Sequence, residues 1–374
     1  MAEDKRIYLI GLTQLKGIGD MLARQLLHYF DNEAQEVFAA KKQTLEKIPG
    51  IGAVKAEAIM QSKAEALRNA AKELAFVEKK KLRLFSITDE DYPVRLCECL
   101  DAPVVFYYTG SADLNVQRVL SIVGTRSATD YGEKLTGLLL KELSEMFSGL
   151  LVVSGLAYGI DICAHRSAVK FGLPTVGVLA HGLDRLYPSS HRKTAIEMLE
   201  QGGGLLTDFV SGTVPGRENF LQRNRLIAGL SDATIVVESA EKGGALVTAD
   251  IALSYGREVY TFPGRVSDRY SEGCNRLIHT NKAGLITSAR DLVEALNWDL
   301  KGRKQASQQP CLAFANELPR SPVLDVIAEK KQIQINELSL LLDIPVHQLS
   351  PVLFELELAG YIRAIPGGAY RLNF

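Results

Sequence analysis

The sequence lacks several features that would assign it to a familiar functional class. Across its 374 residues, no apolar run approaches the ~18 residues that a membrane-spanning helix needs. The first residues, MAEDKRIYLIG, mix acidic and basic side chains before a short apolar run, which is not the pattern of a signal peptide. Both absences predict a cytoplasmic protein without a membrane span.

Cysteine is scarce and no sign of charge dominates. The five cysteines are odd in number and scattered, which suits a reducing compartment. Cys97 and Cys99 lie close together, but no second Cys/His pair follows at zinc spacing, so no metal site is expected. The formal net charge is −1. If the protein binds nucleic acid, its basic surface must therefore be local.

The usual phosphate-binding and catalytic motifs are also missing. No G-x-x-x-x-G-K-[ST] loop is present, which argues against P-loop ATP hydrolysis. No GxGxxG precedes an acidic residue at the spacing of a dinucleotide site, so no cofactor is expected. Asp161 and His165 are four residues apart and form either a catalytic dyad or a simple helix-face hydrogen bond. No convincing catalytic set emerges, and we expect a non-enzymatic protein.

Residues 1–80 predict a small helical domain. LTQLKGIGDMLARQLLHYF (12–30) and LEKIPGIGAVKAEAIM (45–60) each place Gly-Ile-Gly before a helix and resemble a tandem, SAM-like helix-hairpin-helix module. Such turns leave backbone N–H groups free to meet a phosphate, although these pairs often serve only as packing units. The 11 basic and 10 acidic residues within 1–75 do not decide between the two roles.

Residues 81–298 predict an extended Rossmann-like domain. Near-continuous apolar runs alternate with helical stretches, as expected for parallel strands that are buried on both faces. This alternation, with glycine-bearing turns, indicates βαβ units and a doubly wound parallel sheet. The expected strands are VVFYY (104–108), VLSIV (119–123), LLVVS (150–154), PTVGVLA (174–180), GLLTDF (204–209), ATIVVE (233–238) and EVYTF (258–262).

The C-terminal part predicts a linker and a winged-helix domain. Residues 299–320 are polar and patternless. Residues 321–374 predict three helices and a terminal hairpin that turns at Pro366–Gly368. This domain has 4 basic and 6 acidic residues, and its predicted recognition helix carries Glu355 and Glu357, which would face phosphates badly. We expect it to contact protein or to bind DNA only weakly.

Five glycine-bearing turns follow strands of the predicted sheet. They are GTRSATDYG (124–132), SGLAYGIDICAHR (154–166), AHGLDRLYPSSHRK (180–193), DFVSGTVPGRENFLQRNR (208–225) and ESAEKGGALVTAD (238–250). Ligands of open α/β sheets bind beyond the carboxyl ends of the strands, and helix starts there favour anions. Residues 120–298 have 18 basic and 19 acidic side chains. The arginines are nevertheless gathered in these turns, so a local phosphate site is expected. In the first turn, Asp130 and Glu133 predict a capping box.

The order of these segments resembles the DprA/Smf family of DNA-processing proteins. The matching stretches are SIVGTR (121–126), VVSGLAYGID (152–161), GLDRLYP (182–188), NFLQRNRLIAGLSDATIVVES (219–239), GGALVTADIALSYGREVYTFPG (243–264) and EGCNRLI (272–278). The resemblance covers about 85–298 closely and both ends loosely. It implies binding of single-stranded DNA, loading of RecA onto it during natural transformation, and a homodimer formed through the Rossmann-like domain.

The resemblance also implies which residues contact DNA. The arginine of the first turn falls on Arg126, and Leu221 stands where the family commonly has proline. The full expected set is Gly124, Thr125, Arg126, Gly155, His191, Arg192, Lys193, Phe220, Arg223, Asn224, Arg225, Gly243, Gly244 and Thr248. Phe220 or Tyr187 would stack on bases, although core packing is the favoured interpretation of both rings.

Two other functional classes compete with this prediction. The GGALVTAD turn (243–250) distantly resembles the PGGxGT loop of nucleotide phosphoribohydrolases, although Asp250 stands where that pattern would want glutamate. Such an enzyme would release a base from nucleoside monophosphates. A plain interaction scaffold is the other alternative, and it would leave five anion-ready turns without a use.

Overall fold

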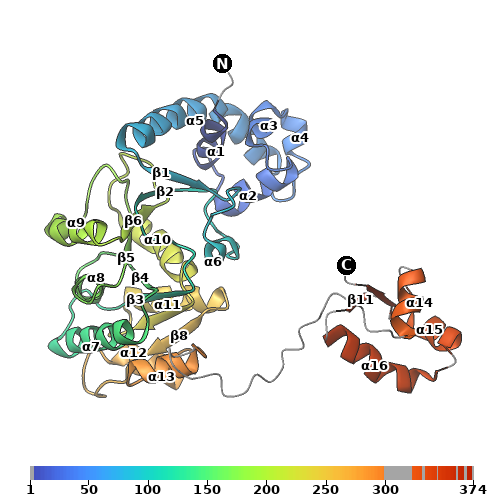
Figure 1. Ribbon diagram of the computed structural model, residues 1–374. Coiled ribbons are helices and arrows are strands. Elements are labelled where there is room, and N and C mark those ends of the chain that lie inside the picture. The colour runs from blue at the N-terminus through green and yellow to red at the C-terminus, as the bar shows by residue number, and fades with distance from the viewer. Residues whose placement is uncertain are drawn as a thin grey trace. The chain divides into compact units, whose positions relative to one another are not determined.

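The computed structural model describes residues 4–298, 322–330, 333–342, 344–358, 361–365 and 369–372. They divide into two compact units, one within Met1–Arg303 and one within Lys304–Phe374. The predicted linker at 299–320 and the predicted turn at 366–368 lie outside the described residues. Figure 1 shows the elements of both units.

The first unit begins with five helices that enclose their own core. The glycine turns before α2 and α5 have the same form, because Gly17 and Gly50 both adopt left-handed backbone angles, with φ of 75° and 79°. The core includes Ile10, Leu26 and Ile59, all fully buried. The helices are α1 (Lys5–Thr13), α2 (Asp20–Tyr29), α3 (Ala34–Ala39), α4 (Lys42–Leu45) and α5 (Ala53–Lys80). The expected helix-hairpin-helix tandem is therefore present.

A nine-stranded sheet follows, in the order β1-β2-β6-β5-β4-β3-β7-β8-β9. Every pairing from β6 to β9 is parallel, which confirms the doubly wound sheet. The strands are β1 (Arg83–Ser86), β2 (Val105–Gly110), β3 (Arg118–Val123), β4 (Leu150–Ser154), β5 (Thr175–Val178), β6 (Gly204–Thr207), β7 (Ala233–Val236), β8 (Glu258–Thr261) and β9 (Gly284–Leu285). The sequence did not predict β1 or β9.

The expectation that β2 is a parallel strand was wrong. It pairs antiparallel with both β1 and β6. Its apolar run has another cause, because two different cores cover it. Val104 and Val105 pack into the core of the N-terminal helices, whereas Phe106 and Tyr108 pack into the core of the sheet. Burial on both faces therefore did not require crossover helices.

Helices cover both faces of the sheet (Figure 1). Leu226 of α10 and Ala249 of α11 pack on one face, whereas Leu139 of α7, Ala164 of α8 and Leu292 of α13 pack on the other. The helices of this part are α6 (Val94–Cys97), α7 (Asp130–Met146), α8 (Ile160–Lys170), α9 (Arg192–Glu200), α10 (Arg217–Gly229), α11 (Gly244–Ser254), α12 (Glu272–His279) and α13 (Ala289–Ala295).

The second unit is the expected winged-helix domain. It contains α14 (Pro322–Lys330), β10 (Ile333–Gln334), α15 (Ile335–Leu342), α16 (Val346–Leu358), β11 (Ile362–Ile365) and β12 (Ala369–Leu372). Its strands form an antiparallel sheet in the order β10-β12-β11, with Arg363 opposite Arg371. Leu324, Ile327 and Leu349 lie in its core. Within the described parts of both units, no helix has the length and apolarity to cross a membrane.

Candidate nucleic-acid interface

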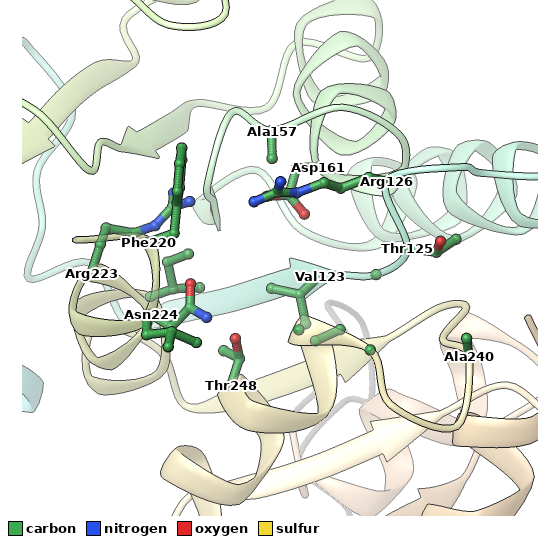
Figure 2. Close-up of a pocket in the computed structure, with 16 residues that line it drawn as sticks. Val123, Thr125, Arg126, Ala157, Asp161, Phe220, Arg223, Asn224, Ala240 and Thr248 are labelled. Atoms are coloured by element: carbon green, nitrogen blue, oxygen red, sulfur yellow. The ribbon is translucent and has the colours of Figure 1, made fainter. Parts of the chain in front are cut away.

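The strand order reverses between β3 and β7. After β3 the chain builds β4, β5 and β6 on one side of it, and then returns to build β7, β8 and β9 on the other. The connections leaving β3 and β7 diverge, which opens a crevice at the carboxyl ends of the strands. A cavity of about 230 Å³ lies there, shown in Figure 2. It is lined by Val123, Gly124, Thr125, Arg126, Ala157, Asp161, Phe220, Leu221, Arg223, Asn224, Ile227, Ala240, Gly243, Gly244, Ala245 and Thr248.

The first turn is held tightly against its neighbours. The backbone N–H of Thr125 donates to the carbonyl of Glu238 at 2.7 Å, and the carbonyl of Thr125 accepts from the N–H of Ile160 at 3.1 Å. A Cβ at Gly124 would lie 2.5 Å from Cγ1 of Ile160, which leaves room for glycine alone. The turn therefore connects the loops that follow β4 and β7, and it presents the next residue, Arg126, from a fixed base.

The expected capping box of α7 is not formed by Asp130 and Glu133. Thr129 is the N-cap, and its hydroxyl accepts from the N–H of Gly132 at 3.3 Å. The reciprocal carboxylate comes from the loop after β7, where Glu238 accepts from the N–H of Thr129 at 2.9 Å and from its hydroxyl. The pattern failed because a carboxylate from a distant part of the chain lies within hydrogen-bond distance of the N-cap residue. Glu238 is buried beside the helix start and accepts from the actual N-cap residue, one position before the predicted one.

Arg126 is the uncommitted cation of the cavity. It is exposed, and it forms no ion pair or side-chain hydrogen bond with any residue that the structure describes. Its guanidinium carbon lies 5.0 Å from the ring centroid of Phe220, a cation–π arrangement. Figure 2 shows Arg126 extending from the first turn toward Phe220 on α10. All the guanidinium N–H groups remain available to phosphate oxygens.

The expectation that Phe220 and Tyr187 belong to a core was wrong. Tyr187 is 47% exposed and Phe220 is half-buried, and neither side chain belongs to a hydrophobic core. Their ring centroids are 6.1 Å apart with planes tilted by 51°. Both rings line one cavity of about 730 Å³, together with Arg126. Exposed aromatic rings beside an arginine suit the stacking of unpaired bases.

This larger cavity shares several lining residues with the first, so the two form one groove. The larger cavity is lined by Arg126, Tyr187, Pro215, Gly216, Arg217, Phe220, Leu221, Lys242, Gly243, Gly244 and Val247. Its lining has three cations and no carboxylate. Arg217 and Lys242 were not in the expected DNA-binding set. A signal for both was present, since each adjoins a glycine at a helix start on this edge of the sheet.

Arg223 lines the cavity but is committed to the protein. It is only 3% exposed, and its Nη1 donates to the carbonyl of Gly155 at 2.6 Å and to that of Val178. Burial lowers the pKa of Arg223 to about 10, an effect that the carboxylate of Asp161 opposes. A Cβ at Gly155 would lie 2.2 Å from this guanidinium. Arg223 and Gly155 therefore shape the wall where β4 and β5 end.

Asn224, Thr248, Gly243 and Gly244 all line the smaller cavity, and their contact with DNA stays a prediction. Figure 2 shows the Asn224 amide and the Thr248 hydroxyl facing the same space. The Asn224 side chain forms no hydrogen bond within the described part of the chain. Gly243 is the N-cap of α11, and the N-terminus of that helix opens toward the cavity. These groups add neutral donors to the positive charge of Arg126.

Arg225 has a different role from the expected DNA contact. It is 7% exposed, and Nη2 forms ion pairs with Asp208 and, at 2.8 Å, with Asp20 of α2. Its Nη1 donates to the carbonyl of Asp101 at 2.7 Å. Burial raises the pKa of Asp20 to about 6 and also raises that of Asp208, against the opposing charge of Arg225. With these partners, Arg225 joins domains and is not free to bind phosphate.

The segment at the start of α9 lies apart from the groove. His191 is 3% exposed, and its Nδ1 is 2.8 Å from the carbonyl of Leu156, so the ring is part of the interior and is not open to DNA. Arg192 and Lys193 are exposed, but neither lines the two cavities of the groove. Contact of Arg192 and Lys193 with DNA stays a prediction.

The residues of the enzymatic alternatives do not assemble a site. His165 is fully buried with Nδ1 2.7 Å from the hydroxyl of Thr175, and Asp161 accepts from the N–H of Gly155 at 3.2 Å. Asp161 and His165 therefore form neither the catalytic dyad nor the helix-face hydrogen bond that their spacing offered. Asp250 is exposed and pairs with Lys282 at 2.7 Å, outside the cavity lining. This placement gives no support to the phosphoribohydrolase alternative.

Fold and cavity place the chain among Rossmann-like proteins whose ligand lies at the switch point of the sheet. Comparisons narrow this class. The family model of DNA recombination-mediator protein A matches residues 83–297. The model of the SAM-like helix-hairpin-helix tandem matches residues 9–70, and that of the DprA winged helix domain matches residues 308–368. The chain belongs to the DprA/Smf family of DNA-processing proteins, as its motifs indicated.

Individual relatives agree with this assignment. Protein Smf of Escherichia coli is 34% identical over 313 residues, which cover 80% of each chain. DNA processing protein DprA of Streptococcus pneumoniae is 36% identical over 58% of this chain and 75% of that one. The X-ray structure of the pneumococcal protein superimposes with a TM-score of 0.65 at 32% identity, covering 77% of this chain and 97% of that chain.

A second similar structure is that of a protein whose description names the ligand it binds. DNA processing protein A from Helicobacter pylori has been described with its single-stranded DNA binding mode. It superimposes on this chain with a TM-score of 0.52 at 28% identity, over 59% of this chain and 97% of its own.

Proposed function

We propose that this protein binds single-stranded DNA without sequence preference and loads RecA onto it as a recombination mediator in natural transformation. In this proposal it acts in the cytoplasm, as a homodimer formed through the Rossmann-like domain, and catalyses no reaction. The observation that supports the proposal best is the groove itself. Arg126, Arg217 and Lys242 line its larger cavity without a carboxylate, beside the aromatic rings of Tyr187 and Phe220.

These groups suit a strand of any sequence. Arginine and lysine contacts to phosphates carry no sequence information. Stacking on an aromatic ring tolerates every base because every base has a flat apolar face, and it requires bases that are not paired. The related protein from Helicobacter pylori is described as binding single-stranded DNA, which agrees with this chemistry.

The test is filter binding of single- and double-stranded oligonucleotides across a range of salt concentrations. Arg126→Ala removes the uncommitted guanidinium and should weaken single-strand binding by about 10- to 100-fold, the usual value of one charged contact. It should also lower the slope of log affinity against log salt by about 0.7. Arg290→Ala is the matched control, because Arg290 is exposed on α13 and pairs with Glu294. Unchanged binding by Arg126→Ala would remove the site assignment.

The partners in the proposal have separate tests. Loading predicts that the protein speeds assembly of RecA on single strands already covered by a single-strand binding protein, and that Arg126→Ala abolishes this stimulation. A homodimer predicts a sedimentation mass of twice the 41.0 kDa chain, and two grooves on one strand would bind with greater avidity than either alone. The winged-helix domain, with its excess of acidic residues, is proposed to contact protein.

A further inference from the structure

One segment contributes residues to both cavities of the groove. We call residues 208–225 the groove arm: it comprises the loop after β6 and the first turns of α10. Arg217 and Phe220 of the arm line the larger cavity, and Arg223 and Asn224 line the smaller one. The position of the arm therefore sets the width and the charge of the groove.

The two ends of the arm are joined to each other and to the N-terminal helices. Arg225 at one end pairs with Asp208 at the other, and Asp20 of α2 joins the same guanidinium at 2.8 Å. Because Asp20 begins the helix of the first glycine hairpin, its carboxylate attaches this hairpin to the base of the arm. The first hairpin thus has a packing role.

The middle of the arm is held by another helix of the same domain. Glu73 of α5 accepts from the backbone N–H of Ser211 with both carboxylate oxygens, at 2.9 and 3.0 Å, and also from the Ser211 hydroxyl. Glu73 is only 5% exposed, and no lysine or arginine pairs with it among the described residues. A buried carboxylate is costly unless hydrogen bonds satisfy it. Here the arm supplies those hydrogen bonds.

The opposite side of the arm is held by the loop after β5. Asp184 accepts from the N–H of Gly212 at 2.9 Å, and the N–H of Gly182 donates to the carbonyl of Thr213 at 3.3 Å. Beyond these contacts the arm emerges into solvent. Val214 is 59% exposed, and Arg217 is exposed three residues later. The fixed and free parts of the arm meet directly at 211–214.

Apolar packing between the helical domain and the arm is incomplete. A cavity of about 180 Å³ lies between them, with Ile18 and Asp20 on one side and Asp208, Phe209 and Val210 on the other. A tightly packed interface would position the arm through apolar contacts alone. In this interface the polar contacts of Glu73 and Asp20 carry more of that task.

We infer that the N-terminal helical domain positions the DNA groove, with Glu73 as a positioning residue that sets the arm through Ser211. Glu73 does not touch DNA. It holds the loop in the position from which Arg217 reaches a phosphate. The inference rests on the proposed function of the groove and adds to it a task for a domain that lies outside the Rossmann-like fold.

The test is a double-mutant cycle in the full-length protein, read as single-strand affinity and its salt dependence. Arg217→Ala should weaken binding by about tenfold and lower the salt slope by about 0.7, because one phosphate contact is lost. Glu73→Ala should lower the salt slope by the same amount, although this variant still contains Arg217. The double variant should bind no more weakly than Arg217→Ala, since both changes remove one contact. Glu65→Ala is the control, because Glu65 lies exposed on the same helix and pairs with Lys16.

Conservative changes keep the test decisive if Glu73→Ala fails to fold. Glu73→Gln retains an oxygen that accepts from Ser211 and should bind within about twofold of the unaltered protein. Glu73→Leu and Ser211→Pro both remove the hydrogen bond between the Ser211 N–H and Glu73. Each should lower the slope of log affinity against log salt by about 0.7. Additive losses in the double-mutant cycle, or an unchanged salt slope in folded Glu73→Leu or Ser211→Pro, overturn the inference. If Arg126→Ala and Arg217→Ala themselves leave binding intact, the proposed function fails first.

Discussion

The two halves of α10 carry the same residue type in opposite environments. In the first half, Arg217 is exposed on a cavity that has no carboxylate in its lining. In the second half, Arg223 and Arg225 are buried, and carbonyl or carboxylate oxygens accept hydrogen bonds from their guanidinium groups. The difference teaches that the acceptors within reach decide an arginine's task. Its spacing in the sequence does not. An arginine with bound acceptors supports the groove, and one without them is available to a ligand.

The largest effect that tests this comparison is on stability. Arg225→Ala should lower the free energy of unfolding by about 3–5 kcal/mol, because it leaves Asp20 and Asp208 buried together without their cation. Urea unfolding at neutral pH measures this loss. Arg217→Ala is the control and should change stability by no more than about 0.5 kcal/mol, as for exposed residues in general. Equal effects of the two substitutions would remove the distinction between the halves.

Much of the fold was predictable from local pattern. The parallel strands β3, β4 and β7 are short apolar runs because helices cover both faces, and the turns after them carry glycine where neighbouring chain segments approach closely. The two strands that were not predicted have weak local signals. β1 is the four-residue run RLFS with an arginine at its start, and β9 has only two residues. Their pairing depends on a neighbouring strand already being in place.

The site was predictable in location but not in the state of each side chain. The turns at the switch point had to meet once the strand order was known. The partners of buried arginines leave no local pattern, since Arg225 and Asp20 are 205 positions apart and Glu73 and Ser211 are 138 apart. The family resemblance implied a DNA contact for both Arg126 and Arg225. In the structure Arg126 has no ion pair among the described residues, whereas Arg225 pairs with Asp20 and Asp208. Only the folded contacts separate these two cases.

A second prediction sharpens the comparison on the exposed side. Phe220→Ala should weaken single-strand binding by about 1–3 kcal/mol, the usual value of stacking one base, because the ring is half-buried beside Arg126. Competition titrations with a fluorescent oligonucleotide measure the change. Phe220→Trp keeps a stacking face and should retain affinity. A salt slope that falls in Phe220→Ala would contradict a stacking role, since stacking releases no counterions.

A third prediction concerns how a buried histidine, His165, makes the stability of the protein depend on pH. Burial lowers the pKa of His165 to about 3, below its ordinary value of 6.5. The folded protein therefore binds fewer protons than the unfolded chain between these values, so the stability contributed by neutral His165 is present above pH 6.5 and is lost as pH falls. From pH 7.5 to 5.5 the loss should be about 1.4 kcal/mol. Urea unfolding of the protein and of His165→Gln measures it, and equal pH dependence in both would exclude His165 as the cause.

The smallest expected effect tests whether exposure alone is enough to make an arginine a DNA contact. In the winged-helix domain Arg363 and Arg371 lie directly opposite each other on β11 and β12, and both are exposed. Like charges at such a position repel, so Arg363→Thr should stabilise the hairpin by about 0.2–1 kcal/mol, measured by hydrogen exchange of its backbone amides. Single-strand affinity should stay within about twofold, because the acidic residues of this domain oppose phosphate binding. A loss of affinity as large as that of Arg126→Ala would show that exposure alone makes an arginine a DNA contact, and the lack of carboxylates in the larger cavity of the groove would then explain nothing.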